Sequence, residues 1–89
     1  MAGKFHFSLV SPEKELFSGE VDQVDAPGVD GDFGVFSGHE PFMTTLRSGA
    51  VTVRDGGKTR VFTIEGGFAD VTPESLTILA ESAVEATVQ

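Results

Sequence analysis

Turn signals interrupt this chain at short, regular intervals, and this spacing restricts its fold more than any other feature. Clusters of Gly, Pro, Asp and Ser occur at residues 11–13, 26–32, 55–58, 66–67 and 71–75. Runs of strand length lie between such signals, and turn signals every 8–12 residues are typical of all-β domains. No stripe of apolar residues at helical spacing occurs before residue 80. We therefore predict an all-β fold, either a sandwich or a barrel.

Alternation of side chains places the individual strands. Phe5, Phe7 and Leu9 recur with the period of two that lets a strand bury one face. Val21 and Val24 are an odd number of residues apart, so one flat strand over residues 16–26 would send them to opposite faces, and we expect a bulge or a strong twist there. Further strands are expected at residues 33–36, 42–46, 49–54, 60–65 and 76–79, with residues 55–58 as a hairpin turn.

Three segments are predicted to lie outside these strands. Residues 26–32 have the chemistry of a loop, because Pro fixes φ and Gly allows positive φ. Gly66 and Gly67 indicate a bulge or a corner. Residues 82–89 are rich in Ala and Glu and could start a helix, although the segment is too short to be a stable helix alone.

Size and charge exclude several classes of protein. A chain of 89 residues is one small domain, not a two-domain enzyme. Six Lys and Arg against 14 Asp and Glu give a net charge of -8, which argues against a nucleic-acid binder and suggests a basic or neutral partner. Because the sequence contains no Cys, it excludes disulfides, thiolate catalysis and iron–sulfur clusters. No apolar run approaches membrane-spanning length and residues 1–7 are too polar for a secretory signal, so we expect no direct membrane insertion.

The candidate catalytic and metal-binding groups match no complete motif. Ser37 and His39 lie two residues apart, but their context lacks the G-x-S-x-G elbow, so a turn or interface role is expected for His39. The acidic residues of the segment from Asp25 to Glu40 miss the spacing of an EF-hand loop, which leaves a calcium- or sugar-binding sandwich as a weaker alternative. His6 and His39 lack a third ligand at convincing spacing. We therefore predict no cofactor and no metal.

Lys58 supports an alternative from another class of protein. Lipoyl and biotinyl carrier domains are small, acidic β domains that present a modified Lys at a hairpin. Their Lys is flanked by Asp or Met, whereas Gly57 and Thr59 flank Lys58. A solvated turn lysine is the favoured interpretation, and a carrier domain modified at Lys58 remains the alternative.

Several ordered blocks resemble the epsilon subunits of F-type ATP synthases. The first is residues 16–19 and the second is the long segment 27–42, which contains Gly38, His39 and Pro41. Residues 65–71 and 76–83 resemble the closing strands of that family. The resemblance extends from residue 5 to residue 83, with the blocks in the expected order and spacing.

This resemblance implies a two-sheet β-sandwich of about ten short strands. It also implies a non-catalytic subunit of the central stalk, which rotates with the gamma subunit and the ring of c subunits and couples ion flow to ATP synthesis. The subunit would be peripheral, at the cytoplasmic face of a bacterial inner membrane or its organelle equivalent. A part that transmits torque needs a close-packed, stiff core rather than reactive groups.

The resemblance assigns two sets of interface residues. Contact with the c ring falls on Asp30, Gly31 and Asp32 and on Glu40, Pro41 and Phe42, with Asp32 as the acid that meets the polar loop of the ring. Contact with gamma falls on Ser11, His39, Met43 and Thr44.

Domain organisation departs from the family pattern at the end of the sequence. Typical members continue into a two-helix domain that can inhibit ATP hydrolysis and in some members binds ATP. We expect a sandwich domain over residues 1–83 and a tail over residues 84–89, without that helical domain. Inhibition by the helices and nucleotide binding are therefore not assigned to this sequence.

Overall fold

In a computed structural model of the protein, residues 3–86 are described, and they form ten β-strands and no helix, so that no helix among them could cross a membrane. The all-β prediction is confirmed. The strands are β1 (Phe5–Val10), β2 (Glu15–Val21), β3 (Gln23–Gly28), β4 (Gly31–Val35), β5 (Phe42–Leu46), β6 (Gly49–Asp55), β7 (Lys58–Ile64), β8 (Gly67–Val71), β9 (Ser75–Ala80) and β10 (Ala83–Glu85).

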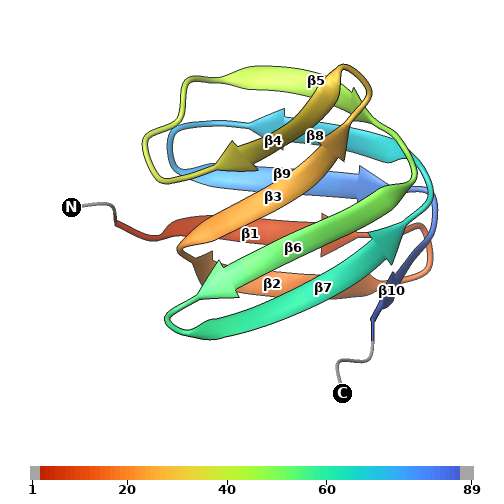
Figure 1. Ribbon diagram of the computed structural model, residues 1–89, viewed down its shortest axis with the longest axis horizontal. Helices are drawn as coiled ribbons and strands as arrows, with labels where there is room; N and C mark the ends of the chain where they lie inside the picture. Colours follow the sequence, from red (N-terminus) through yellow and green to blue (C-terminus); the bar gives the residue numbers. More distant parts are fainter. Residues whose placement is uncertain (1–2, 87–89) are drawn as a thin grey trace.

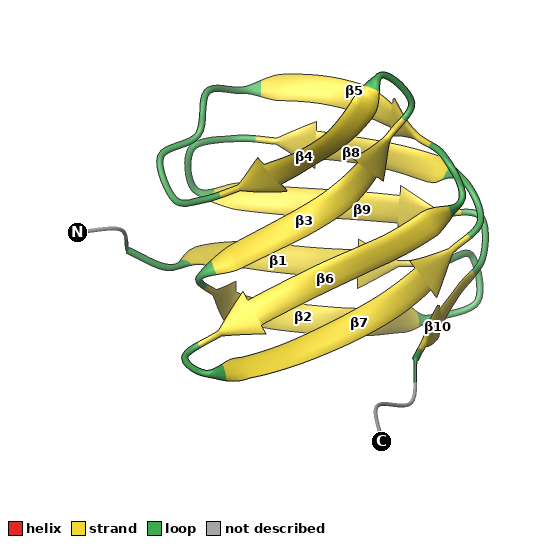
Figure 2. Ribbon diagram, in the orientation of Figure 1, coloured by secondary structure: helices red, strands yellow, loops and turns green. Residues whose placement is uncertain are grey.

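The strands form two layers that nearly close into a barrel (Figures 1 and 2). One path of hydrogen-bonded neighbours runs β10-β7-β6-β3-β5-β8-β9-β1-β2, and β4 pairs with β3. The register joins β3 to β5 only through Gly28 and Leu46, so the first layer is β10-β7-β6-β3-β4 and the second is β5-β8-β9-β1-β2. Strands β2 and β10, at the two ends of the path, line opposite sides of one shallow hollow. The predicted two-sheet sandwich is therefore correct.

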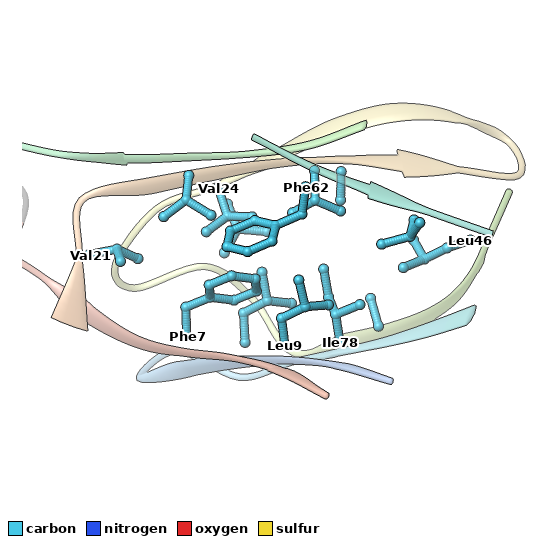
Figure 3. Close-up of a cluster of buried hydrophobic side chains, with 14 of the residues drawn as sticks. Phe7, Leu9, Val21, Val24, Leu46, Phe62 and Ile78 are labelled. Atoms are coloured by element: carbon cyan, nitrogen blue, oxygen red, sulfur yellow. The ribbon is translucent and has the colours of Figure 1, made fainter. Parts of the chain in front are cut away.

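Apolar side chains from both layers fill the space between the sheets (Figure 3). Phe5, Phe7 and Leu9 of β1 point inward and are buried, as their alternation predicts. They meet Phe62 and Ile64 from β7 of the other layer, which are fully buried. Each large apolar side chain buried in this way contributes about 1.5–3 kcal/mol to folding. A close-packed core of this kind resists deformation.

Val21 and Val24 belong to two separate strands, so a break between strands, not a bulge within one, accounts for their odd spacing. A bend at Asp22 ends β2 and lets β3 begin in the other sheet. Both valines are fully buried, one from each layer. The expectation of a single distorted strand over residues 16–26 is therefore wrong, because the chain changes sheets between the two residues.

Residues 26–32 are more regular than the predicted loop. Strand β3 continues to Gly28 and β4 begins at Gly31, which leaves only Val29 and Asp30 as the turn of a hairpin. Gly31 has a φ of 136°, and a Cβ on Gly28 would lie 2.6 Å from the carbonyl oxygen of Gly31. Pro27 lies inside β3, and its carbonyl accepts a hydrogen bond from the backbone N–H of Arg47. The glycines thus tighten the hairpin instead of opening a loop.

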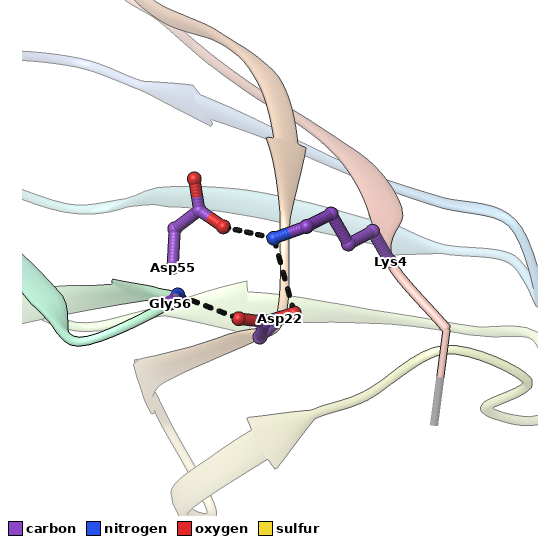
Figure 4. A network of polar contacts seen from close by, with 4 residues as sticks. All are labelled: Lys4, Asp22, Asp55 and Gly56. Carbon is purple, nitrogen blue, oxygen red and sulfur yellow. Dashed lines mark hydrogen bonds and ion pairs between the residues drawn. The ribbon is translucent and has the colours of Figure 1, made fainter. Parts of the chain in front are cut away.

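A network of charged groups ties three segments together at the end of the sandwich where the N-terminal segment enters (Figure 4). Lys4 Nζ donates to Asp22 Oδ1 at 3.2 Å and also to Asp55, and the backbone N–H of Gly56 donates to Asp22 Oδ2 at 2.7 Å. The hydrogen bond from the Gly56 N–H lowers the pKa of Asp22 most, and the hydrogen bond from Lys4 lowers it further. The hydrogen bonds to Asp55 and Asp22 raise the pKa of Lys4. The bend between β2 and β3 is thereby fixed to the β6–β7 turn.

The segment that could start a helix instead forms strand β10. Ala83, Val84 and Glu85 pair antiparallel with the edge of β7, opposite Ile64, Thr63 and Phe62. Arg60 holds this strand with two hydrogen bonds of 2.8 Å to the Glu85 carboxylate, and its guanidinium lies over the ring of Phe17 at 5.0 Å. The hydrogen bonds from Arg60 lower the pKa of Glu85. Pairing with the available edge of β7 therefore outweighs the weak helix propensity of this segment. Residues 87–89 of the same segment lie outside the described residues.

Candidate functional site

The outer face of the β5-β8-β9-β1-β2 layer carries the largest exposed apolar side chains of its strands. Met43 on β5 is 64% exposed, Phe68 on β8 is 37% exposed and Leu79 on β9 is 54% exposed. The strand register places Phe68 opposite Leu79 and Leu79 opposite Val10 of β1, while Met43 lies one strand away from Phe68. We call Met43, Phe68, Leu79 and Val10 the apolar stripe. An exposed stripe of this kind is typical of a surface that another protein covers.

The same layer has no Lys or Arg in any of its five strands. Apart from the stripe, its outward positions are mostly occupied by hydroxyl and acidic side chains, such as Thr45, Asp70 and Thr77. The opposite layer and its turns carry ion pairs, including Arg54 with Asp25 and Arg60 with Glu85. One face of the sandwich thus carries ion pairs of Arg with acidic residues, and the other carries an apolar stripe among acidic and hydroxyl side chains, with no Lys or Arg in its strands.

Ser11 lies at one end of the stripe, but its hydroxyl is used locally. The residue is buried, and its Oγ donates to the carbonyl of Lys14 at 3.2 Å across the turn between β1 and β2. An apolar hollow beside it is lined by Val10, Ser11, Pro12, Leu79, Ala80 and Glu81. Ser11 therefore shapes the turn that borders this hollow.

The segment predicted to contact gamma divides between two surfaces. Met43 points outward into the stripe, whereas its neighbour Thr44 is half-buried on the other side of β5. The His39 ring packs on Phe42 with centroids 5.2 Å apart, and its Nδ1 lies 3.0 Å from the Glu40 carbonyl oxygen. The structure therefore places Met43 with Ser11 along the stripe, and it places His39 on the side of the sandwich between β4 and β5.

The segments predicted to contact the c ring lie at the two ends of β4. Asp30 and Gly31 form the exposed tip of the β3–β4 hairpin, and Asp32 follows as an exposed residue of β4. Glu40 and Pro41 are exposed in the loop beyond the other end of this strand. Phe42 is half-buried and packs edge-on against Phe33, with the ring centroids 5.3 Å apart, so it helps to close the side of the sandwich. The two groups share one side of the molecule but not one loop.

Asp32 has a partner within the chain that the sequence did not indicate. Arg47, in the turn between β5 and β6, donates from Nη2 to Asp32 Oδ1 and from Nη1 to the carbonyl of Ser48. Both side chains of the ion pair remain largely exposed. A pair exposed to this degree contributes little to stability, about 0–1 kcal/mol, so a cation from a partner could replace Arg47.

Asp25, one of the acids weighed for metal binding, is held in other contacts. Asp25 accepts hydrogen bonds from Gln23 Nε2 at 2.8 Å and Arg54 Nε at 3.4 Å. Within residues 3–86 no group of three or more His, Cys, Asp or Glu side chains is arranged to hold a metal ion. Lys58 is the first residue of β7 opposite Asp55, so the hairpin tip itself is formed by the two glycines before it.

One array on β1 and β2 has the order of a nucleophile, a base and an acid. His6 Nε2 lies 3.3 Å from Ser18 Oγ, and His6 Nδ1 lies 3.1 Å from Glu20 Oε2. The array lies open on the outer face, where the His6 and Glu20 side chains are 47% and 60% exposed. Nucleophilic catalysis draws on preorganised donors in a site shielded from water, and this position provides no such shielding. The geometry therefore fits a polar contact between neighbouring strands.

Sequence reasoning missed Phe68, Leu79 and Arg47 as surface residues of interest. The alternation in residues 75–80 contained a signal for Leu79, because Leu76 and Ile78 occupy the inward positions. The contact of Arg47 with Asp32 joins residues 15 positions apart and depends on the hairpin geometry, which the sequence did not reveal.

Comparison with known proteins matches nearly the whole sandwich. Residues 4–86 match the sequence model of a family described as "ATP synthase, Delta/Epsilon chain, beta-sandwich domain". An ATP synthase epsilon chain of Caulobacter vibrioides is 74% identical over 83 residues, which cover 93% of this chain and 96% of the relative. Another, of Hyphomonas neptunium, is 63% identical over 93% of this chain, but the match spans only 62% of that longer relative.

Solved structures show the same fold. A chain in the cryo-EM structure of the Euglena gracilis mitochondrial ATP synthase, described as OSCP/F1/c-ring, matches with a TM-score of 0.87 and 27% identity over 92% of this chain and 53% of that one. A chain in the central stalk and c-ring structure of the Tetrahymena thermophila mitochondrial ATP synthase matches with a TM-score of 0.77 over 93% of this chain and 67% of that one, at 15% identity, which supports the fold alone.

Proposed function

The chain belongs to the delta/epsilon-chain family of ATP synthases, and from this premise we propose that it is a non-catalytic central-stalk subunit that binds the gamma subunit and the ring of c subunits. It would couple ion-driven rotation to ATP synthesis by transmitting torque between these partners. A stiff sandwich suits such a role, since a close-packed core resists deformation. The proposed location is peripheral, at the cytoplasmic face of a bacterial inner membrane.

The exposed apolar stripe is the main support for the proposed contact with gamma. It lies on the sheet face whose strands contain no Lys or Arg, and the turn that contains Ser11 borders it. Covering exposed apolar area of this kind is favourable by about 25 cal/mol per Å². A permanent contact that bears load should bury more than about 1,000 Å² in total, so gamma would cover most of this sheet face, and the half-buried His39 and Thr44 would lie toward its margin.

The acidic hairpin tip is the proposed contact with the c ring. Asp30, Gly31 and Asp32 are exposed at this tip, and Asp32 is held in place by Arg47. Acidic groups at a rim mainly steer assembly toward basic loops and fix the register. Glu40, Pro41 and Phe42 would contribute from the same side of the sandwich, beyond the other end of β4.

The gamma contact is tested by placing a charge in the stripe. Leu79→Lys should abolish or strongly reduce co-purification with a co-expressed gamma subunit, because a Lys would be buried without a partner. Val84→Lys is the matched control: Val84 is also an exposed apolar residue, at 62%, but it lies on β10 away from the stripe. We expect Val84→Lys to co-purify like the wild-type chain. Equal recovery of gamma with both variants, or no recovery with the folded wild-type chain, would refute this assignment.

The c-ring contact is tested by crosslinking in the assembled complex. A chain with Asp32→Cys should form a disulfide with a Cys introduced into the polar loop of the c subunit, since the tip is exposed and close to it in the proposed assembly. Lys58→Cys, at the β6–β7 turn, is the control and should not crosslink. A failure of Cys at Asp30, Gly31 and Asp32 alike would rule out this placement of the hairpin.

A further inference from the structure

Asp70 is the acidic residue placed within the apolar stripe. It lies on the outer face of β8, is exposed, and follows Phe68 by two residues on the same face. The register places it opposite Met43 on β5 and opposite Thr77 on β9. Its carboxylate is therefore bordered by two members of the stripe.

No cation within residues 3–86 pairs with this carboxylate. The ion pairs of Lys and Arg in this part of the chain use other acids, and the five strands of the Asp70 layer contain neither Lys nor Arg. The acids that pair with Lys or Arg are Asp22, Asp25, Asp32, Asp55 and Glu85, and Glu20 lies against His6. Asp70 therefore has no Lys or Arg partner within residues 3–86.

A partner that covers the stripe must also compensate the negative charge of Asp70. Covering Met43 and Phe68 removes water from the flank of Asp70, and an ionised carboxylate taken from water without a partner is strongly unfavourable. The surface of the partner must therefore place a cation next to the Asp70 carboxylate.

We propose that Asp70 determines the specificity of this face, which fits an apolar surface of the gamma subunit carrying one Lys or Arg opposite Asp70. This inference rests on the proposed function and names the chemistry that gamma must present. The paired cation would set the register of gamma on the sheet, because an apolar stripe alone is compatible with several positions along it.

A second copy of this chain is a poorer occupant for the same face. Two copies would each bring a net charge of -8 and a sheet face without Lys or Arg, so neither face offers a Lys or Arg to pair with Asp70. Charge complementarity therefore favours the gamma subunit.

The test compares the affinity for purified gamma of four folded chains: wild type, Asp70→Asn, Asp70→Lys and Glu65→Lys. Glu65→Lys is the control for net charge, because Glu65 is an exposed residue in the turn before β8, outside the sheet face. We expect Asp70→Asn to weaken binding by about thirtyfold and Asp70→Lys by more than about a hundredfold, since each leaves a cation of gamma without its partner. Glu65→Lys should change the affinity by less than about threefold.

The partner residue is then found by reversal of charge. A Lys→Glu or Arg→Glu substitution in gamma should restore binding of Asp70→Lys while weakening binding of the wild-type chain. Wild-type affinity in both Asp70 variants would overturn the inference while leaving the proposed function intact. A wild-type chain that fails to bind gamma, or binds itself through this face, would overturn both.

Discussion

Phe62→Ala is expected to destabilise the domain by about 3–5 kcal/mol. Phe62 on β7 is fully buried, lies in the core that joins the two layers (Figure 3), and packs against the ring of Phe17 at 6.2 Å. Removing the ring takes away its burial energy and leaves a cavity between sheets that cannot fully collapse. A domain of this length has a total stability of roughly 4–13 kcal/mol, so the variant should lose about a quarter of that stability or more. The free energy of unfolding from urea titration measures the loss.

Phe68→Ala is the matched control, since it removes the same ring from the other face of the same fold. Phe68 points outward from β8 and is 37% exposed, so we expect a loss below about 1 kcal/mol. The two variants should separate stability from binding: Phe62→Ala unfolds easily, whereas Phe68→Ala stays folded and loses affinity for gamma. A comparable loss of stability in both variants would contradict the assignment of inner and outer faces.

Alternation and turn chemistry predicted most of the fold because both are local. The inward positions of β1 follow directly from Phe5, Phe7 and Leu9, and the β6–β7 hairpin follows from the glycines at its turn. The places where prediction failed involve partners distant in sequence. The bend at Asp22 is fixed by Lys4 and Gly56, and β10 forms because the edge of β7 is available.

The proposed binding surfaces were predictable only in part. The resemblance led to Asp32 and Met43, which the structure places at an exposed tip and on an exposed sheet face. Phe68 and Leu79 were interpreted only as strand residues, because which face of a strand meets solvent depends on how the sheets pack. The position of Asp70 among them required the register of three strands. Local patterns and the resemblance identify single residues, whereas the surface that these residues form depends on how the strands pair across the sheet.

Gly67→Ala is expected to cost more than about 2 kcal/mol and to weaken gamma binding as well. Gly67 has a φ of 149°, a conformation that side-chain-bearing residues rarely adopt. A Cβ at this position would lie 2.5 Å from the carbonyl oxygen of Leu79 and 3.0 Å from Ala80 Cα. Because these are backbone atoms of β9, relief of the clash requires β8 and β9 to separate. Thermal unfolding and the affinity for gamma measure the two effects.

The link between these two effects comes from the register. Gly67 immediately precedes Phe68, and Phe68 faces Leu79 across the same pair of strands, so any separation of the strands displaces two members of the stripe. Gly19→Ala on β2 is the control, because a Cβ there would make an ordinary contact of 3.7 Å with the Phe17 ring, and it should cost less than about 1 kcal/mol. If Gly67→Ala matched Gly19→Ala in stability, the close approach of β8 to β9 would be wrong. If it lost stability but kept full affinity, the stripe would not be the surface that gamma covers.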